Sequence, residues 1–581
     1  MTQSNMLKVL SLAVGTSVLL SGCDGLGKMI KKQNLITYEV KPNPLQMHGD
    51  SVSVTISGKY PAKLFAKKAV VTVTPVLKYN GGEKQLKQQV LVGETATASG
   101  TKISYTTGGT FSYSDKFGYD PAMKNAKLEL RAQGALKKKT KDFTAIEVAD
   151  GTVATPLLVR NDEKGIYAKD AFTKSVPVSQ SASIYYAMSQ SVVRPAEMKS
   201  EEMKAIHKFI SDNIANPNFE FKGIDVSAYA SPDGEQDKNA NLAEDRAKSG
   251  SKALRDEFAK NKNKDITFGK DEKQYKVTTT AEDWDGFKKL MEASSIQDKD
   301  LILRVLTMYS NLDQREQEIK NLSKTYKEVS DQILPKLRRS VLNIVAEQKS
   351  RNDETIVRMC KTTPDSLSIE ELLYGANLID DVNTKMSVYK AAEAKYSSDW
   401  RASNNLGVTY LLNNKIGEAK AAFERAQKSN PGNPIVMNNM GAVVAKNGDR
   451  RAAMEYFNKA SGAGPEVAYN KAIVAVRDGK YSEAVSGFGS YKGFNLALAQ
   501  LLNGSSDAVA STIDASNEKE MAISYYLKAI AAARKGDASG IASLKTAIEK
   551  DGSLKAMAKD DCEFIKWRDN ADFKSLTDVA H

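Results

Sequence analysis

The sequence predicts a multidomain protein with an N-terminal antiparallel β-sandwich, a middle α/β domain that carries a helical insertion, and a C-terminal all-α stack of helical repeats. Three patterns predict this order. Polar and apolar residues alternate at period two within residues 35–175, strand and helix patterns mix over 176–345, and a 34-residue spacing recurs within 368–581. A chain of 581 residues is long enough for several domains.

The first segment, residues 1–22, is expected to be a signal peptide. Its apolar run, Val9–Leu20, has the length of a signal-peptide core and is too short to span a bilayer. The run ends in Leu20-Ser21-Gly22-Cys23, which resembles the lipobox of bacterial lipoprotein signals. The resemblance implies cleavage before Cys23 and acyl chains on its thiol, which would hold the mature chain on a membrane. An ordinary secretory signal with an incidental cysteine is the alternative.

Residues 23–34 are expected to be a short, partly basic tether. Asp24 is its only acidic residue, and lysines follow. Surface-exported lipoproteins of the Bacteroidota tend to carry an acidic cluster after the cysteine, so the resemblance implies a protein anchored in the outer membrane and facing the periplasm.

Composition argues against several chemistries. Only Cys360 and Cys562 remain beside Cys23, and only three histidines occur, so neither a disulfide framework, a metal centre nor a Ser-His-Asp arrangement is indicated. No cofactor is expected. The formal charge of +12 is spread along the chain and could attract anionic lipid, but no basic motif with interleaved aromatic residues suggests nucleic acid.

The β-sandwich is expected over residues 35–175. Residues 50–60 (DSVSVTISGKY) and 127–136 (KLELRAQGAL) alternate at period two, and residues 69–79 (AVVTVTPVLKY) are rich in β-branched side chains and precede an Asn-Gly-Gly turn. Short strands at this spacing are typical of an immunoglobulin-like sandwich. No reactive cluster stands out, so a spacer or docking domain is predicted.

The middle domain, residues 176–345, resembles the OmpA C-terminal-like family. The resemblance rests on Ala228-Tyr229-Ala230-Ser231-Pro232-Asp233-Gly234 with Asn239, Leu242, Arg246 and Ala247, and on a closing strand at 334–345. It implies a β-α-β-α-β fold. Residues 265–333 exceed what this fold needs and read as a mostly helical insertion with a solvated charged face that adds surface for a partner.

The same resemblance implies binding of the peptidoglycan stem peptide. Family members hold its diaminopimelate end, a zwitterion, with an Asp on the loop and an Arg on the helix. Arg246 matches the Arg position, but Ser231 stands where the Asp is usual, and Asp233 could replace it if the loop turned inward. The implied set is therefore Ser231, Asp233, Asn239 and Arg246. Alternatively, Arg246 pairs with a structural carboxylate such as Glu244 or Asp245.

A linker is expected over 346–367, followed by repeats over 368–581. Residues of the same kind recur every 34 positions: Tyr389, Phe423 and Phe457; Ala392, Ala426 and Ala460; Gly407 and Gly441; Pro431 and Pro465. This pattern resembles the tetratricopeptide repeat, in which small residues let helices approach, aromatic residues fill between them and Pro ends the second helix.

Four polar side chains of the first helices are candidates for a partner groove: Asn404, Asn405, Asn438 and Asn439. The resemblance implies that they line the concave face and bind a peptide backbone or tail. Exposed asparagines without a ligand are the alternative.

Taken together, the patterns predict a non-enzymatic adaptor. Lipid on Cys23 would fix one end in the outer membrane, the middle domain would contact peptidoglycan, and the repeats would hold one or more proteins of an envelope assembly or secretion complex; modest binding by each module could suffice. A middle domain that only docks proteins is one alternative. A cell-wall hydrolase is another, and it would need paired carboxylates or a metal cluster in a cleft.

Overall fold

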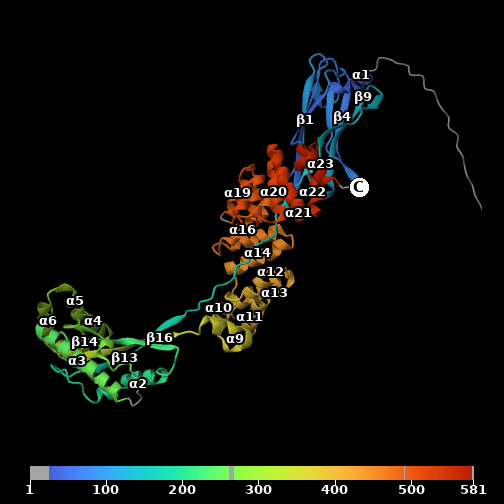
Figure 1. Cartoon of the computed structure of the whole chain (residues 1–581). Helices are drawn as coiled ribbons and strands as arrows, with labels where there is room; N and C mark the ends of the chain where they lie inside the picture. The colour runs from blue at the N-terminus through green and yellow to red at the C-terminus, as the bar shows by residue number, and fades with distance from the viewer. Residues whose placement is uncertain (1–24, 261–266, 490, 579–581) are drawn as a thin grey trace, which may run out of the picture. The chain divides into compact units, whose positions relative to one another are not determined.

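The computed structural model describes residues 25–260, 267–489 and 491–578 (Figure 1). The expected signal peptide and Cys23 lie outside these residues. The chain divides into two compact units, and the first is discontinuous: unit 1 combines Met1–Ala168 with Tyr396–His581, whereas unit 2 is the intervening Lys169–Lys395. Among the described residues, no helix combines the length and apolar content that a membrane span requires.

Unit 1 begins with a β-rich region of two sheets. The first sheet contains β1 (Thr37–Lys41), β2 (Leu45–His48), β3 (Ser51–Tyr60), β8 (Gly109–Gly118) and β12 (Thr152–Val153). The second contains β4 (Val70–Tyr79), β5 (Gly82–Gln85), β6 (Gln89–Gly93), β7 (Thr101–Ile103), β9 (Lys127–Leu136), β10 (Lys139–Asp142) and β11 (Ile146–Asp150). Side chains of both sheets, such as Val52, Ile56, Val71 and Leu91, share one buried core.

Two details of this region differ from the expectation. The sheets are not purely antiparallel, because β12 pairs with β2 and β7 pairs with β6 in parallel. Only hairpin-linked neighbours must be antiparallel, and neither pair is joined by a hairpin. Residues 25–34 are also not a free tether: α1 (Gly25–Lys31) buries Leu26 and Met29, three positions apart on one helix face, in the β-region core.

The C-terminal part of unit 1 is all helical. Its helices are α12 (Trp400–Leu412), α13 (Ile416–Ser429), α14 (Pro434–Lys446), α15 (Arg450–Lys459), α16 (Glu466–Arg477), α17 (Tyr481–Phe488), α18 (Phe494–Leu502), α19 (Ala508–Asp514), α20 (Ala522–Lys535), α21 (Ile541–Lys550), α22 (Ser553–Asp560) and α23 (Ala571–Thr577). The small residues act as the sequence predicts: a Cβ on Gly407 would lie 2.5 Å from the Phe423 ring, and one on Gly441 would lie 2.6 Å from Phe457.

The β-rich region packs directly on these helices. The Thr155 hydroxyl donates to the buried Glu563 carboxylate, which Arg534 also binds at 2.9 Å. The His48 ring meets Tyr481 edge to face at 4.9 Å between ring centroids. These contacts join sequence-distant parts of the chain into one unit.

Unit 2 is built on a four-stranded sheet in the order β13 (Ser175–Tyr185), β16 (Arg339–Lys349), β14 (Phe219–Tyr229) and β15 (Tyr275–Thr280). Only β15 pairs in parallel. Its other elements are α2 (Glu201–Asn213), α3 (Gln236–Ala259), α4 (Trp284–Ala293), α5 (Lys299–Met308), α6 (Leu312–Asn321), α7 (Ser323–Gln332), α8 (Leu334–Leu337), α9 (Asp353–Thr362), α10 (Ile369–Asn377) and α11 (Val382–Lys395). Helices α4–α7 lie in the expected insertion at 265–333, which also contains β15 of the core sheet, and together with α8 they bury a core of their own.

The expected linker at 346–367 is structured. Its first residues continue β16, and α9 follows after three residues. Helix α9 buries Ile356 and Cys360, four positions apart, which explains why this stretch is a helix. Helices α10 and α11, expected to begin the repeat domain, belong to unit 2.

Candidate functional site

An extended segment of unit 1, residues 159–168, runs along the first helices of the repeats (Figure 1). We call it the strap. It forms no helix or strand, and it contacts asparagine side chains from α12, α14, α16 and α18. We call these side chains the asparagine ladder: Asn404, Asn405, Asn438, Asn439, Asn470 and Asn495.

Four ladder residues each bind one strap residue through both backbone groups. The side-chain oxygen accepts from the strap N–H and the side-chain amide donates to the C=O of the same residue, at 2.7 to 3.0 Å. The pairs are Asn495 with Arg160, Asn470 with Lys164, Asn439 with Ile166, and Asn405 with Ala168. The last three strap residues are spaced by two, as in a β-strand, so the ladder takes the place of a neighbouring strand.

The other two asparagines brace the ladder. Asn404 donates to Ile166 O at 3.1 Å and to Asn405 Oδ1 at 3.1 Å. Asn438 does the same one repeat later, donating to Lys164 O at 3.0 Å and to Asn439 Oδ1 at 3.1 Å. Asn439 also donates to Asn404 Oδ1 at 2.9 Å and Asn470 to Asn438 Oδ1 at 3.0 Å, so five of the six ladder amides form one connected network with the strap.

Strap side chains add charged contacts. The Tyr469 hydroxyl donates to Asp162 at 2.8 Å, and Lys446 Nζ lies 3.4 Å from the Glu163 carboxylate. Arg160 forms an ion pair with Glu518. Burial raises the pKa of the Glu163 carboxyl, with Lys446 acting in the opposite direction.

Burial explains why the strap and ladder need one another. Five ladder asparagines are 0% exposed and Asn495 is 2% exposed. A buried amide without partners costs about 1–3 kcal/mol. The four asparagines expected to line a partner groove do bind a peptide backbone, but that backbone belongs to their own chain.

Two ladder residues, Asn470 and Asn495, were missed by sequence reasoning. Asn470 follows Asn439 by 31 residues and Asn495 follows Asn470 by 25, because the later repeats shorten. An asparagine sought at the equivalent position of each shortened repeat would have found them. The strap itself carries no periodic signal, since its partners contact its backbone.

The residues implied in peptidoglycan binding lie together in unit 2, at the end of β14 and the start of α3. The Ser231 hydroxyl donates to the Asp233 carboxylate, and Arg338 Nη2 lies 3.0 Å from the same carboxylate. Arg338 Nε also contacts Ser231 Oγ at 3.2 Å. Asn239 closes the loop by donating to Ser231 O at 3.2 Å and Gly234 O at 3.1 Å.

Arg246 is fully buried in this cluster, with 0% of its surface exposed. Its Nε donates to Gln190 O and its Nη1 to Tyr229 O, each at 3.0 Å. Burial lowers the pKa of the guanidinium to about 10, which leaves it charged at neutral pH. The alternative pairing with Glu244 or Asp245 is wrong, because both carboxylates lie near Lys248 instead and Arg246 binds carbonyls.

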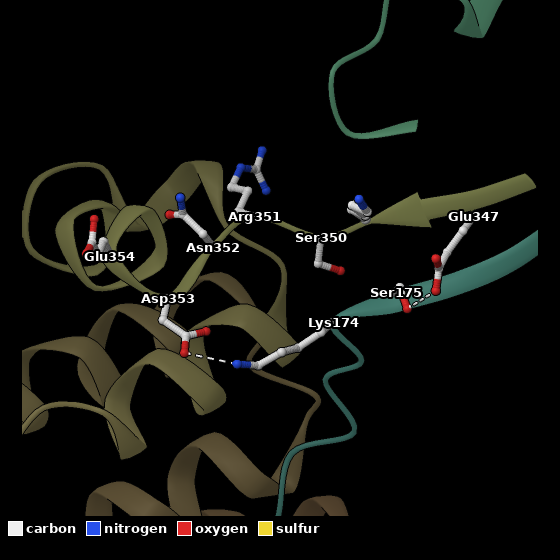
Figure 2. Close-up of a pocket in the computed structure, with 9 residues that line it drawn as sticks. Lys174, Ser175, Glu347, Ser350, Arg351, Asn352, Asp353 and Glu354 are labelled. Carbon is white, nitrogen blue, oxygen red and sulfur yellow. Dashed lines mark hydrogen bonds and ion pairs between the residues drawn. The ribbon is translucent and has the colours of Figure 1, made fainter. Parts of the chain in front are cut away.

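A polar cleft of about 580 Å³ also lies in unit 2, where β13 begins and β16 ends (Figure 2). Lys174 Nζ lies 3.1 Å from Asp353, and the Ser175 hydroxyl donates to Glu347 at 2.5 Å. The Asp353 pairing lowers the pKa of this carboxyl and raises that of Lys174. The Lys174–Asp353 pair neutralises two charges within the cleft and ties the start of β13 to α9. Among the described residues, no group of His, Cys, Asp and Glu side chains could hold a metal ion.

Comparisons with known proteins agree with the helical geometry. A tetratricopeptide repeat family model matches residues 387–434, which include α12 and α13. No curated protein matches the chain.

Solved structures with similar folds include YrrB, described as a tetratricopeptide repeat protein with an unusual peptide-binding site (19% identity, 35% of this chain and 94% of that chain, TM-score 0.20). A tetratricopeptide repeat protein from Parabacteroides merdae is 17% identical over 36% of this chain and 97% of that chain, with a TM-score of 0.26. A chain of the APC/C hetero-tetramer Cut9–Hcn1 is 14% identical over 59% of this chain and 74% of that chain, with a TM-score of 0.23. The structure and the family-model match together show a multidomain protein with an N-terminal β-rich region and a C-terminal all-helical region that is similar to tetratricopeptide repeats.

Proposed function

We propose that this protein is a lipid-anchored scaffold of the bacterial outer membrane, facing the periplasm. The anchor rests on the sequence pattern that ends at Cys23, and the observation that supports the scaffold role is the strap in the asparagine ladder. Tetratricopeptide repeats are protein-interaction modules, and here they hold the segment that leads from the β-rich region to unit 2. The repeats thereby fix the β-rich region, which follows the expected anchor, and leave unit 2 and the outer surface of the repeats for partners.

The anchor is supported by the Leu20-Ser21-Gly22-Cys23 pattern. Cells expressing the protein should be labelled with a clickable fatty acid and fractionated. Wild-type protein and Cys360→Ser should carry label and remain in the membrane fraction, whereas Cys23→Ser should lose both. Label that persists in Cys23→Ser, or a mature chain that begins elsewhere, would contradict the anchor.

The OmpA-like resemblance leaves two roles for unit 2, and the geometry favours protein docking over peptidoglycan binding. A zwitterionic ligand needs one free cation and one free anion. Arg246 is buried against carbonyls, and Asp233 is paired with Arg338. Both charges are engaged by the chain itself.

Sedimentation with purified sacculi tests this choice. We expect wild-type protein and Arg246→Ala to remain in the supernatant, while purification from detergent brings down a membrane protein partner. Co-sedimentation of the wild type that Arg246→Ala abolishes would establish the peptidoglycan-binding role instead. Release of soluble wall fragments would favour the cell-wall enzyme.

A further inference from the structure

The sheet of unit 2 ends in an unprotected edge strand. Its two edges are β13 and β15. At the β13 edge, carboxylates cap the backbone: the N–H of Ser183 donates to Glu202 at 2.7 Å and that of Tyr185 to Glu197 at 3.1 Å. Among the described residues, no side chain caps Lys276–Thr279 of β15 in this way. An open edge presents backbone donors and acceptors to another strand.

A groove of about 540 Å³ lies beside this edge. Alternate residues of β15 (Tyr275, Val277 and Thr279) form one wall, and one face of α3 forms the other. Val277 is half exposed. The hydroxyl of Ser251, on α3, is buried in the groove without a hydrogen-bond partner. Helix α3 thus borders the position that a fifth strand would occupy.

The charges beside the β15 edge indicate which kind of strand would pair with it. The groove's own cations on α3 are balanced, since Lys252 pairs with Asp256 at 2.6 Å and Arg255 with Glu272 at 3.2 Å. Lys273 and Lys276 are exposed, and no carboxylate of the described residues lies within 4 Å of them. A second copy of the chain would bring the same lysines together, which disfavours self-pairing and favours a strand with acidic side chains.

We propose that β15 is a docking edge for an extended acidic segment of a partner protein, which adds as a fifth strand. Its backbone pairs with β15, its inward side chains enter the groove over Val277 and Ser251, and its carboxylates meet Lys273 and Lys276. This inference rests on the proposed docking role of unit 2 and names the class of partner segment that it accepts.

A designed peptide tests the inference directly. The probe is a fluorescein-labelled eight-residue peptide that alternates Glu and Val, with a Lys-Val peptide as its control, and anisotropy is measured on the purified full chain in detergent. The Glu-Val peptide should bind and slow hydrogen exchange at residues 275–280, and the Lys-Val peptide should do neither. Lys273→Glu with Lys276→Glu should weaken binding about tenfold or more, because attraction becomes repulsion.

The matched control is Lys289→Glu, an exposed lysine of α4 in the same unit, which should bind the peptide as the wild type does. Absence of binding, or binding that leaves exchange at 275–280 unchanged, would overturn the inference. Since the titration requires no membrane anchoring, its failure is distinguishable from loss of fatty-acid labelling at Cys23.

Discussion

Asn439 and Ile166 are joined by a closed pair of hydrogen bonds, in which Asn439 Oδ1 accepts from the Ile166 N–H at 2.8 Å and its Nδ2 donates to the Ile166 C=O at 2.9 Å. The two residues are 273 positions apart in the chain. The same amide also donates to Asn404 Oδ1 at 2.9 Å. This relationship turns the repeats into a clamp on the chain's own strap.

Replacing Asn439 by Ala should destabilise unit 1. The substitution leaves the backbone N–H and C=O of Ile166 without this partner, and one orphaned buried group costs about 1–3 kcal/mol. We expect the free energy of unfolding in urea to fall by about 2–4 kcal/mol. Asn458→Ala, on the exposed face of α15, is the control and should change it by no more than about 0.5 kcal/mol. If Asn439→Ala and Asn458→Ala lowered the free energy of unfolding equally, the ladder would not hold the strap.

Replacing Gly407 by Ala should also destabilise the repeats. Its new Cβ would lie 2.5 Å from the Phe423 ring, and overpacking of this kind costs about 1–3 kcal/mol. Gly417→Ala, in α13, meets nothing within 4 Å and should be neutral or slightly stabilising through helix propensity. Thermal unfolding of the two variants measures the difference. A Gly407→Ala protein as stable as Gly417→Ala would show that the helices are not held this close.

The repeats and their asparagines were predictable because Gly407 and Gly441, like Asn404 and Asn438, keep a fixed spacing and a fixed chemistry. The strap was not predictable from the sequence. The ladder binds its backbone N–H and C=O groups, which do not depend on residue type, and its side chains follow no periodic pattern. Residues 25–34 were misjudged for a related reason: two apolar side chains, Leu26 and Met29, suffice to dock one short helix.

The polar cluster around Arg246 in unit 2 was predictable in its membership but not in its charge pairing. Sequence reasoning brought Ser231, Asp233, Asn239 and Arg246 to one place, where the structure has them. It could not show which charges remain free, because Arg338, which neutralises Asp233, lies 105 residues further along the chain. Whether this cluster binds peptidoglycan stays a prediction for sedimentation to decide.

Replacing Arg338 by Met should destabilise unit 2. The side chains of Arg338 and Asp233 are 7% and 15% exposed, so removing the cation strands a mostly buried carboxylate, at a cost of about 3 kcal/mol. Adding Asp233→Asn should recover part of the loss, as a double-mutant cycle in urea would show. Lys336→Met, an exposed neighbour, should be nearly neutral. A double-mutant cycle that shows no coupling energy between Arg338 and Asp233 would mean that their ion pair does not stabilise unit 2.

Glu163→Gln should change how stability depends on pH. Burial raises the folded-state pKa of Glu163 above its unfolded value, so the folded chain binds the proton more tightly. The free energy of unfolding should therefore fall as pH rises from about 4.3 through the folded pKa. The glutamine variant has no proton to lose, so it should show a flatter profile in urea titrations between acidic and neutral pH and greater stability than wild type at neutral pH. A glutamine variant that is less stable than wild type at neutral pH would mean that the ion pair with Lys446 outweighs burial.

Residue-resolved hydrogen exchange of the strap tests the clamp most directly. The N–H groups of Lys164, Ile166 and Ala168 donate to ladder asparagines, so they should exchange much more slowly than that of Gly165, which lies between two of them. The protection should disappear when Asn405, Asn439 and Asn470 are replaced together by Ala. Rapid exchange throughout residues 159–168 of the wild-type protein would contradict the account.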